Sequence, residues 1–165
     1  MAVADPGRPG APRESTGSGA RALRRLLLAL VALGCVGLSA ELALLEHIES
    51  LLQLVPFGVL LLALAGTVWM WLAPRAAAVH AFRANMALLI LAGVAGLWLH
   101  FDGNRAFELE MEPEAGGLAL VWLALRGATP ALAPGALVQL GLIGLIATYR
   151  HPAVANRTPT GEEGT

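Results

Sequence analysis

Long apolar runs constrain the fold of this chain more than any other feature of its sequence. Residues 26–45, 54–72 and 76–99 are dominated by leucine, alanine, valine and glycine. A helix of about twenty residues spans roughly 30 Å, which is the thickness of the hydrocarbon core of a bilayer. The sequence therefore predicts helices that cross a membrane.

The composition supports this class. Of 165 residues, 56% are hydrophobic and 14% are charged, whereas soluble domains carry roughly 25% charged residues. The lone Cys35 excludes an intrachain disulfide and any metal site with several cysteines. All basic residues other than histidine are arginine, a bias that suggests GC-rich coding and a bacterial source.

A shorter fourth run near the C-terminus completes the predicted architecture. We expect an all-α integral membrane protein with four transmembrane helices over about 24–45, 53–73, 77–99 and 133–150, within a membrane domain at 22–151. The fourth span is short, so tilt or local thinning of the bilayer is needed. Residues 1–21 and 152–165 are polar or rich in Pro and Gly, which predicts disordered cytoplasmic tails.

The first run could instead be a removable signal peptide. A signal core normally has about 7–15 apolar residues. Here the apolar run continues through residues 36–45, beyond Cys35. We therefore interpret it as a retained first span.

The distribution of arginines predicts the orientation. With four spans, both termini lie on one side of the membrane. That side holds nine arginines and the opposite side two: Arg8, Arg13, Arg21, Arg24, Arg25, Arg75, Arg83, Arg150 and Arg157 against Arg105 and Arg126. Cytoplasmic loops carry the excess of arginine, so both termini are expected in the cytoplasm of a bacterial-type plasma membrane.

The outer connection after the third span is the most polar passage inside the apolar region. Phe107, Leu109 and Met111 alternate with glutamates at 108, 110 and 112, which favours an extended acidic segment. Residues 118–125 are too short to cross the bilayer and place their apolar residues on one helical stripe. This predicts a short interfacial helix, with a re-entrant segment or a second strand as alternatives.

Two histidine–carboxylate clusters lie in outer loops under this topology. They supply the candidate metal ligands His47, His100, Glu46, Glu49 and Asp102. Carboxylates with imidazoles suit Mn²⁺, Zn²⁺ or Fe²⁺, so a divalent metal ion is the candidate cofactor. The competing interpretation is a set of solvated loop residues.

Two further polar residues lie within the apolar runs. Glu41 is close to the outer end of the first run; it is either a residue that handles ions or protons, or an ordinary helix-end carboxylate. Asn85 is expected to make an interhelical hydrogen bond, because an unpaired amide in hydrocarbon is costly.

Catalytic signatures are absent from the sequence. It contains no nucleophile elbow, phosphate-binding loop, dinucleotide fingerprint, HExxH or paired CxxC motif, so we expect no enzyme. No basic patch suits nucleic acid. The sequence favours an accessory or transport-related membrane protein that handles a cation or proton at its outer face. The alternative is a structural or assembly subunit whose acidic outer loop binds a membrane or periplasmic protein or a second copy of the chain.

Overall fold

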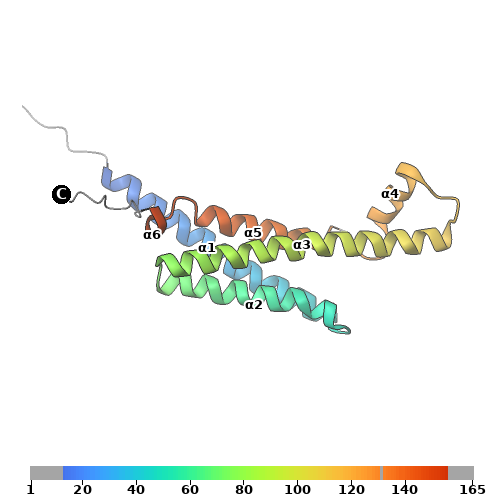
Figure 1. Cartoon of the computed structure of the whole chain (residues 1–165), viewed down its shortest axis with the longest axis horizontal. Helices are drawn as coiled ribbons and strands as arrows, with labels where there is room; N and C mark the ends of the chain where they lie inside the picture. The colour runs from blue at the N-terminus through green and yellow to red at the C-terminus, as the bar shows by residue number, and fades with distance from the viewer. Residues whose placement is uncertain (1–12, 131, 156–165) are drawn as a thin grey trace, which may run out of the picture.

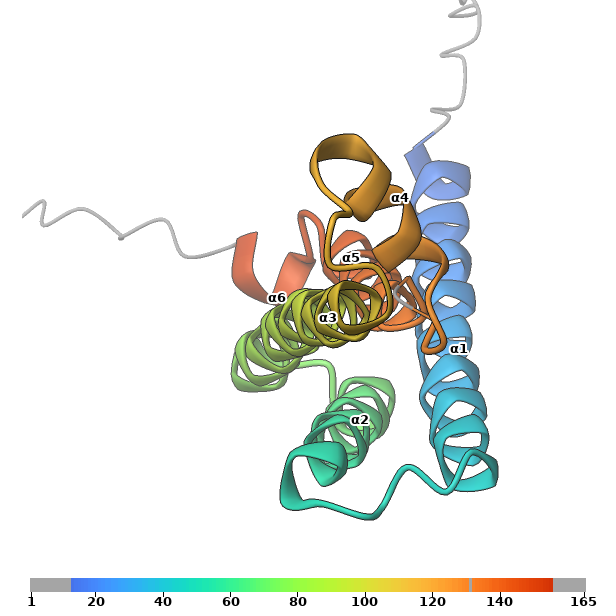
Figure 2. The same cartoon turned by 90° about the vertical axis from the view of Figure 1, so that its right-hand side faces the viewer.

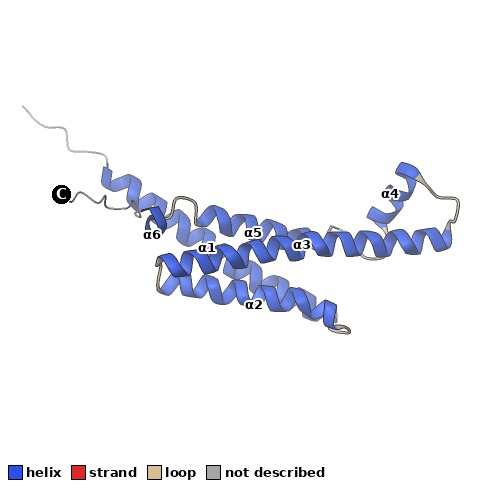
Figure 3. Cartoon of the chain, viewed as in Figure 1, coloured by secondary structure: helices blue, strands red, loops and turns tan. Residues whose placement is uncertain are grey.

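The computed structural model describes residues 13–130 and 132–155, and in these ranges all regular secondary structure is helical, joined by loops and turns, with no strand (Figure 3). The elements are α1 (Arg13–Leu44), α2 (Leu51–Leu72), α3 (Ala76–Met111), α4 (Gly117–Arg126), α5 (Gly135–Ala147) and the single turn α6 (Pro152–Ala155). Three of them, α1, α2 and α3, are long and apolar enough to cross a membrane.

The helices form an elongated bundle. α3 is its axis, with α2 and α5 beside it, and α1 crosses α2 and α5 obliquely (Figures 1 and 2). The core lies where α1, α2, α3 and α5 meet, and its fully buried side chains include Val31, Leu60, Phe82, Met86 and Leu89. Many large apolar side chains point outward instead, as expected of helices that face lipid.

The helix α1 begins earlier than predicted. Residues 13–21, expected in the disordered tail, continue the helix of the first span. Extending an existing helix fixes one residue per hydrogen bond gained, whereas starting a new helix is costly, so a favourable span can extend its helix into a polar flank. Residues 152–155, expected in the C-terminal disordered tail, form the single turn α6. The rest of the predicted disorder, in residues 1–12 and 156–165, lies outside the described residues.

The predicted extended acidic segment is wrong: α3 continues through it as helix to Met111. Repulsion between Glu108 and Glu112 at i,i+4 costs only about 0.2–0.5 kcal/mol, which is too little to end a helix that is already formed. The helix stops where Glu112 precedes Pro113, because a residue before proline disfavours the helical conformation. With 36 residues, α3 is about 54 Å long and projects beyond the ends of α1 and α2 (Figure 1).

The short helix predicted at 118–125 is present as α4, and the strand alternative is wrong. α4 folds back along the projecting part of α3 and packs against no other described helix. We call this pair, residues 101–126, the outer hairpin.

α5 is the predicted fourth run, but its 13 helical residues are fewer than a span requires. It packs closely along α3 through glycines. A side-chain carbon at Gly93 would lie 2.9 Å from the carbonyl oxygen of Pro134 and from the nitrogen of Val138. At Gly141 it would lie 2.7 Å from the carbonyl oxygen of Met86. Such near contact of backbones is what small residues permit between membrane helices.

Asn85 makes an interhelical bond of the kind that the sequence predicts. Its Nδ2 donates to the carbonyl oxygen of Leu62 on α2, at 2.9 Å. Gly66 provides the space, because a side-chain carbon there would lie 2.7 Å from the same nitrogen. The bond therefore fixes the register of α2 against α3.

Replacing Asn85 with leucine should weaken the association of α2 with α3 by about 0.6–2 kcal/mol, because the interhelical bond is lost. The free energy of unfolding in mixed micelles measures this loss. Gly58→Ala is the matched control, since a side-chain carbon at Gly58 meets nothing within 4 Å. Equal stability of Asn85→Leu and the parent would show that the bond contributes nothing.

Candidate functional site: a histidine pair at the outer end

The first histidine is positioned by the way α1 ends. The N–H of His47 donates to the carbonyl of Leu42 at 3.0 Å, and the N–H of Glu46 donates to that of Ala43 at 3.1 Å. These two bonds form a Schellman motif. Its left-handed position, usually glycine, is occupied by Glu46 with φ 53°, so the cap turns the chain sharply and presents His47 beside the bundle.

A capping box then starts α2. The Ser50 hydroxyl accepts from the N–H of Gln53 at 3.3 Å, and the Gln53 side chain accepts from the N–H groups of Ser50 and Glu49 at 3.1 and 2.7 Å. The motif Ser-x-x-Gln is a recognised start signal that the sequence analysis missed. The two caps leave little freedom in the loop that carries His47.

His100 approaches this loop from α3. The rings of His47 and His100 lie 6.4 Å apart between centroids and are inclined by 32°. His100 is half-buried, and its Nδ1 is buried without a hydrogen bond of ordinary geometry in the described chain, although the backbone of Pro130 lies near the side chain. Because an unpartnered buried nitrogen is unfavourable, this atom is the strongest local indication of a ligand. The histidine pair, as we call these two residues, joins segments that are far apart in sequence.

The predicted carboxylate ligands do not join the histidine pair. Glu46 and Glu49 are exposed. Asp102 is exposed as well, and its Oδ1 lies 3.7 Å from Nη1 of Arg105, one turn further along α3. Among the described residues no three His, Cys, Asp or Glu side chains converge so as to hold a metal ion. The five predicted ligands therefore reduce to two imidazoles.

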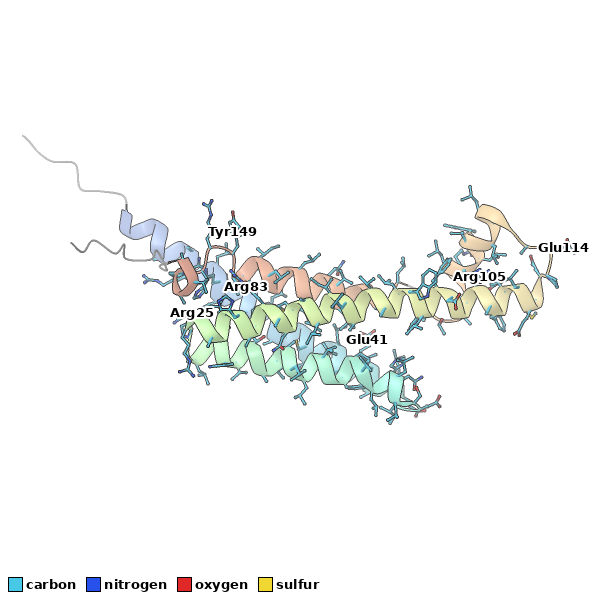
Figure 4. All side chains as sticks on the ribbon, in the orientation of Figure 1. Arg25, Glu41, Arg83, Arg105, Glu114 and Tyr149 are labelled. Carbon is cyan, nitrogen blue, oxygen red and sulfur yellow. The ribbon has the colours of Figure 1, made fainter. Side chains whose placement is uncertain are left out.

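Glu41 lies on the exposed side of α1, one turn before the helix ends (Figure 4). The structure gives its carboxylate no hydrogen bond or ion pair to another described residue. This position fits the helix-end interpretation as well as the ion-handling one.

Asn104 is the polar residue that the sequence analysis missed. It is 3% exposed. Its Nδ2 donates to the carbonyls of Ala124 at 2.9 Å and Thr129 at 2.7 Å, and its Oδ1 accepts from the N–H and hydroxyl of Thr129 at 3.1 and 2.7 Å. Gly127 leaves room for this side chain. Asn104 thus fastens the outer hairpin four residues beyond His100.

The opposite end of the bundle is held by arginines. Arg83 of α3 donates to the hydroxyl and carbonyl of Thr148 at 3.1 and 2.7 Å. Arg24 of α1 donates to the carbonyls of Tyr149 and Arg150 at 3.4 and 3.1 Å. Cations at the C-terminus of a helix bind its free carbonyls and favour its dipole, so these side chains fix the end of α5. Figure 4 shows Arg83 and Glu114 at opposite ends of the molecule.

Comparisons with known proteins give no assignment. No family model matches the chain, and no curated protein or solved structure has significant similarity to it. The function is therefore argued from the residues themselves.

Proposed function

We propose that this is a small accessory or transport-related membrane protein that binds an exchangeable divalent cation, or protons in its place, at its outer face. The observation that carries the proposal is the histidine pair, with the buried, unpartnered Nδ1 of His100. No catalytic constellation accompanies it among the described residues, so we propose a binding role rather than an enzymatic one.

The proposed topology has four crossings, with α5 as the fourth. The chain before α5 is bonded to α3 at Asn104 through Thr129, and the chain after it is bonded at Arg83 through Thr148. These two positions on α3 are about 30 Å apart at 1.5 Å per residue, which matches the hydrocarbon thickness. Under this proposal residues 129–130 and 132–148 traverse the same layer as the longer helices, with turns before and after α5.

The orientation proposed from the arginines has a direct test. Reporter fusions after Arg75 and after Arg150 should read cytoplasmic, and a fusion at Glu114 should read external, because arginine-rich loops remain inside. A cytoplasmic signal at Glu114 together with an external one at Arg75 would reverse the orientation. An external signal after Arg150 alone would remove the fourth crossing.

The chemistry of the proposed site follows from its two nitrogen ligands. Neutral imidazole suits Zn²⁺ and related ions of intermediate softness. With two protein ligands, water must complete the coordination shell, and binding should be weaker and faster to exchange than at a closed structural site. Protons compete for the same nitrogens, so affinity should fall as the pH is lowered and the imidazoles become protonated.

The binding test uses Zn²⁺ and the purified full chain in detergent. His47→Ala combined with His100→Ala should abolish stoichiometric binding in calorimetry, because both imidazole ligands are removed. The matched control is His80→Ala with His151→Ala at the other end of the bundle, which should bind as the parent does. Equal binding by the double outer variant and the parent would disprove the site. If the parent protein binds Zn²⁺ at low salt but not at high salt, the binding is attraction to surface carboxylates instead.

The outer hairpin supports a second candidate function, the docking of a partner protein. It projects past the bundle and exposes the apolar side chains of Phe107, Met111, Leu118 and Trp122, by 50%, 67%, 87% and 60%. Carboxylates at 108, 110, 112 and 114 surround them. An apolar patch with an acidic rim suits a partner with a basic rim. Under this function, charge removal at the four glutamates would abolish binding of the partner protein, and the histidine variants would still bind it.

A further inference from the structure

A cavity lies at the arginine-rich end of the bundle, away from the histidine pair. It has a volume of about 380 Å³ and opens between the start of α3 and the segment that joins α5 to α6. Four of its lining residues are basic or titratable: His80, Arg83, Arg150 and His151. The remaining lining is apolar, from Ala76, Val154 and Ala155.

Among the side chains that the structure describes, none at this end of the molecule is a carboxylate that could balance its arginines. Among residues whose side chains are described, the carboxylates are Glu41, Glu46, Glu49, Asp102, Glu108, Glu110, Glu112 and Glu114, and all belong to the outer half. The only ion pair within that part of the chain joins Arg105 to Asp102. The two arginines that line the cavity therefore have no counter-ion among the described side chains, which favours an anionic occupant.

Two of the polar groups are already held in place. Arg83 uses Nε and Nη2 to bind Thr148, which leaves Nη1 as a donor for another acceptor. His151 is 7% exposed, and its Nδ1 accepts from the N–H of Ala153 at 3.2 Å, which leaves Nε2 free. A preorganised donor loses less entropy on binding than a mobile one. Arg150 and His80 are exposed and complete the rim.

The cavity also lies at the level of the lipid headgroups. Trp69 and Trp71 end α2 beside the start of α3, and Arg75 lies over the Trp69 ring at 5.6 Å. Tryptophan and arginine with this placement mark the membrane–water interface. Phosphate groups are the anions concentrated at that depth, on either side of a membrane.

We propose that this cavity binds a phosphate group, through Arg83, Arg150, His80 and His151, carried by an anionic lipid headgroup or by free phosphate. Guanidinium groups form paired, charge-assisted hydrogen bonds with phosphate oxygens. The apolar lining beside them accommodates the hydrocarbon next to a lipid headgroup. The site is separate from the histidine pair and does not depend on its function.

Protonation of His151 should strengthen this binding. Burial, together with Arg24 on α1 and Arg83 on α3, lowers the pKa of His151 from its ordinary value. Arg150 and His80 also face the cavity, and no described carboxylate does. A bound phosphate favours the charged imidazole and so raises this pKa. Because the pKa of His151 is lowered, this gain in affinity should appear only at a pH below the ordinary titration range of histidine.

The experiment measures binding of two probes to the full chain in a zwitterionic detergent: inorganic phosphate and short-chain phosphatidic acid. Arg150→Gln combined with His80→Gln should weaken binding at least about tenfold, because a guanidinium donor and an imidazole donor are lost. Arg25→Gln is the matched control, since Arg25 is exposed at the same end and does not line the cavity. It should bind within about twofold of the parent.

The two probes distinguish the source of the phosphate. Saturable binding of phosphatidic acid alone supports a lipid headgroup, and saturable binding of both probes supports the phosphate group itself. Binding of inorganic phosphate alone supports a soluble ligand. The proposal is overturned if neither probe saturates, or if Arg25→Gln weakens binding as much as the double variant.

Discussion

Gly93→Ala and Gly141→Ala should each destabilise the bundle by about 1–3 kcal/mol, the range for overpacking a close-packed interior. At both positions the added carbon meets backbone atoms of the facing helix, at Pro134 and Val138 or at Met86. Backbone cannot move aside as a flexible side chain can, so α3 and α5 must separate. The loss should appear in the free energy of unfolding, followed by tryptophan fluorescence in mixed micelles.

The same substitution at open positions should have the opposite sign. Gly37 and Gly58 lie in α1 and α2, and a carbon added to either meets nothing within 4 Å. Alanine is more favourable than glycine inside a helix by roughly 0.5–1 kcal/mol. If alanine at Gly93 and Gly141 is tolerated as well as at these controls, the packing of α5 against α3 is incorrect.

Asn104→Ala should release the outer hairpin from α3. The substitution removes four hydrogen bonds to Ala124 and Thr129, each worth about 0.5–1.5 kcal/mol net, and leaves buried partners unpaired. We expect a local cost of about 2–4 kcal/mol. Because α4 packs only on α3, the loss is confined to the hairpin. Hydrogen exchange measured by mass spectrometry should show faster exchange over 117–130 and unchanged exchange in α2.

A neighbouring residue supplies the control for this measurement. Gly103→Ala changes the adjacent position, where an added carbon meets nothing within 4 Å, and should leave exchange of the hairpin unchanged. Asn104→Asp should speed hydrogen exchange in the hairpin as Asn104→Ala does, since a carboxylate cannot donate to the two carbonyls. Normal protection of α4 in Asn104→Asp would refute the hydrogen-bonding pattern.

The long apolar helices α1, α2 and α3 could be predicted because hydrophobic length is a local property of the sequence. Proline and polar loops also located the ends of α2 and the start of α3 within a few residues. The path of residues 106–112 could not be found from alternation alone. Period-2 patterning identifies a strand only where another strand pairs with it, and here the preceding helix continues at little cost.

The site was only partly predictable for a related reason. Topology is enough to place His47 and His100 on one face, and their rings lie 6.4 Å apart. The directions of Glu46 and Glu49 depend on how α1 is capped, which sequence spacing does not reveal. Asn104 gave no sequence signal beyond being polar, because its partners lie 20 and 25 residues away.

The coordination shell of bound Zn²⁺ tests the central proposal most directly. X-ray absorption at the zinc edge, on full-length protein loaded with one equivalent, should show two imidazole nitrogens at about 2.0–2.1 Å. Water oxygens should complete the shell. The imidazole scattering should disappear in the His47→Ala, His100→Ala variant and persist in the His80→Ala, His151→Ala variant. A shell of oxygen alone in the parent protein would contradict the proposed site.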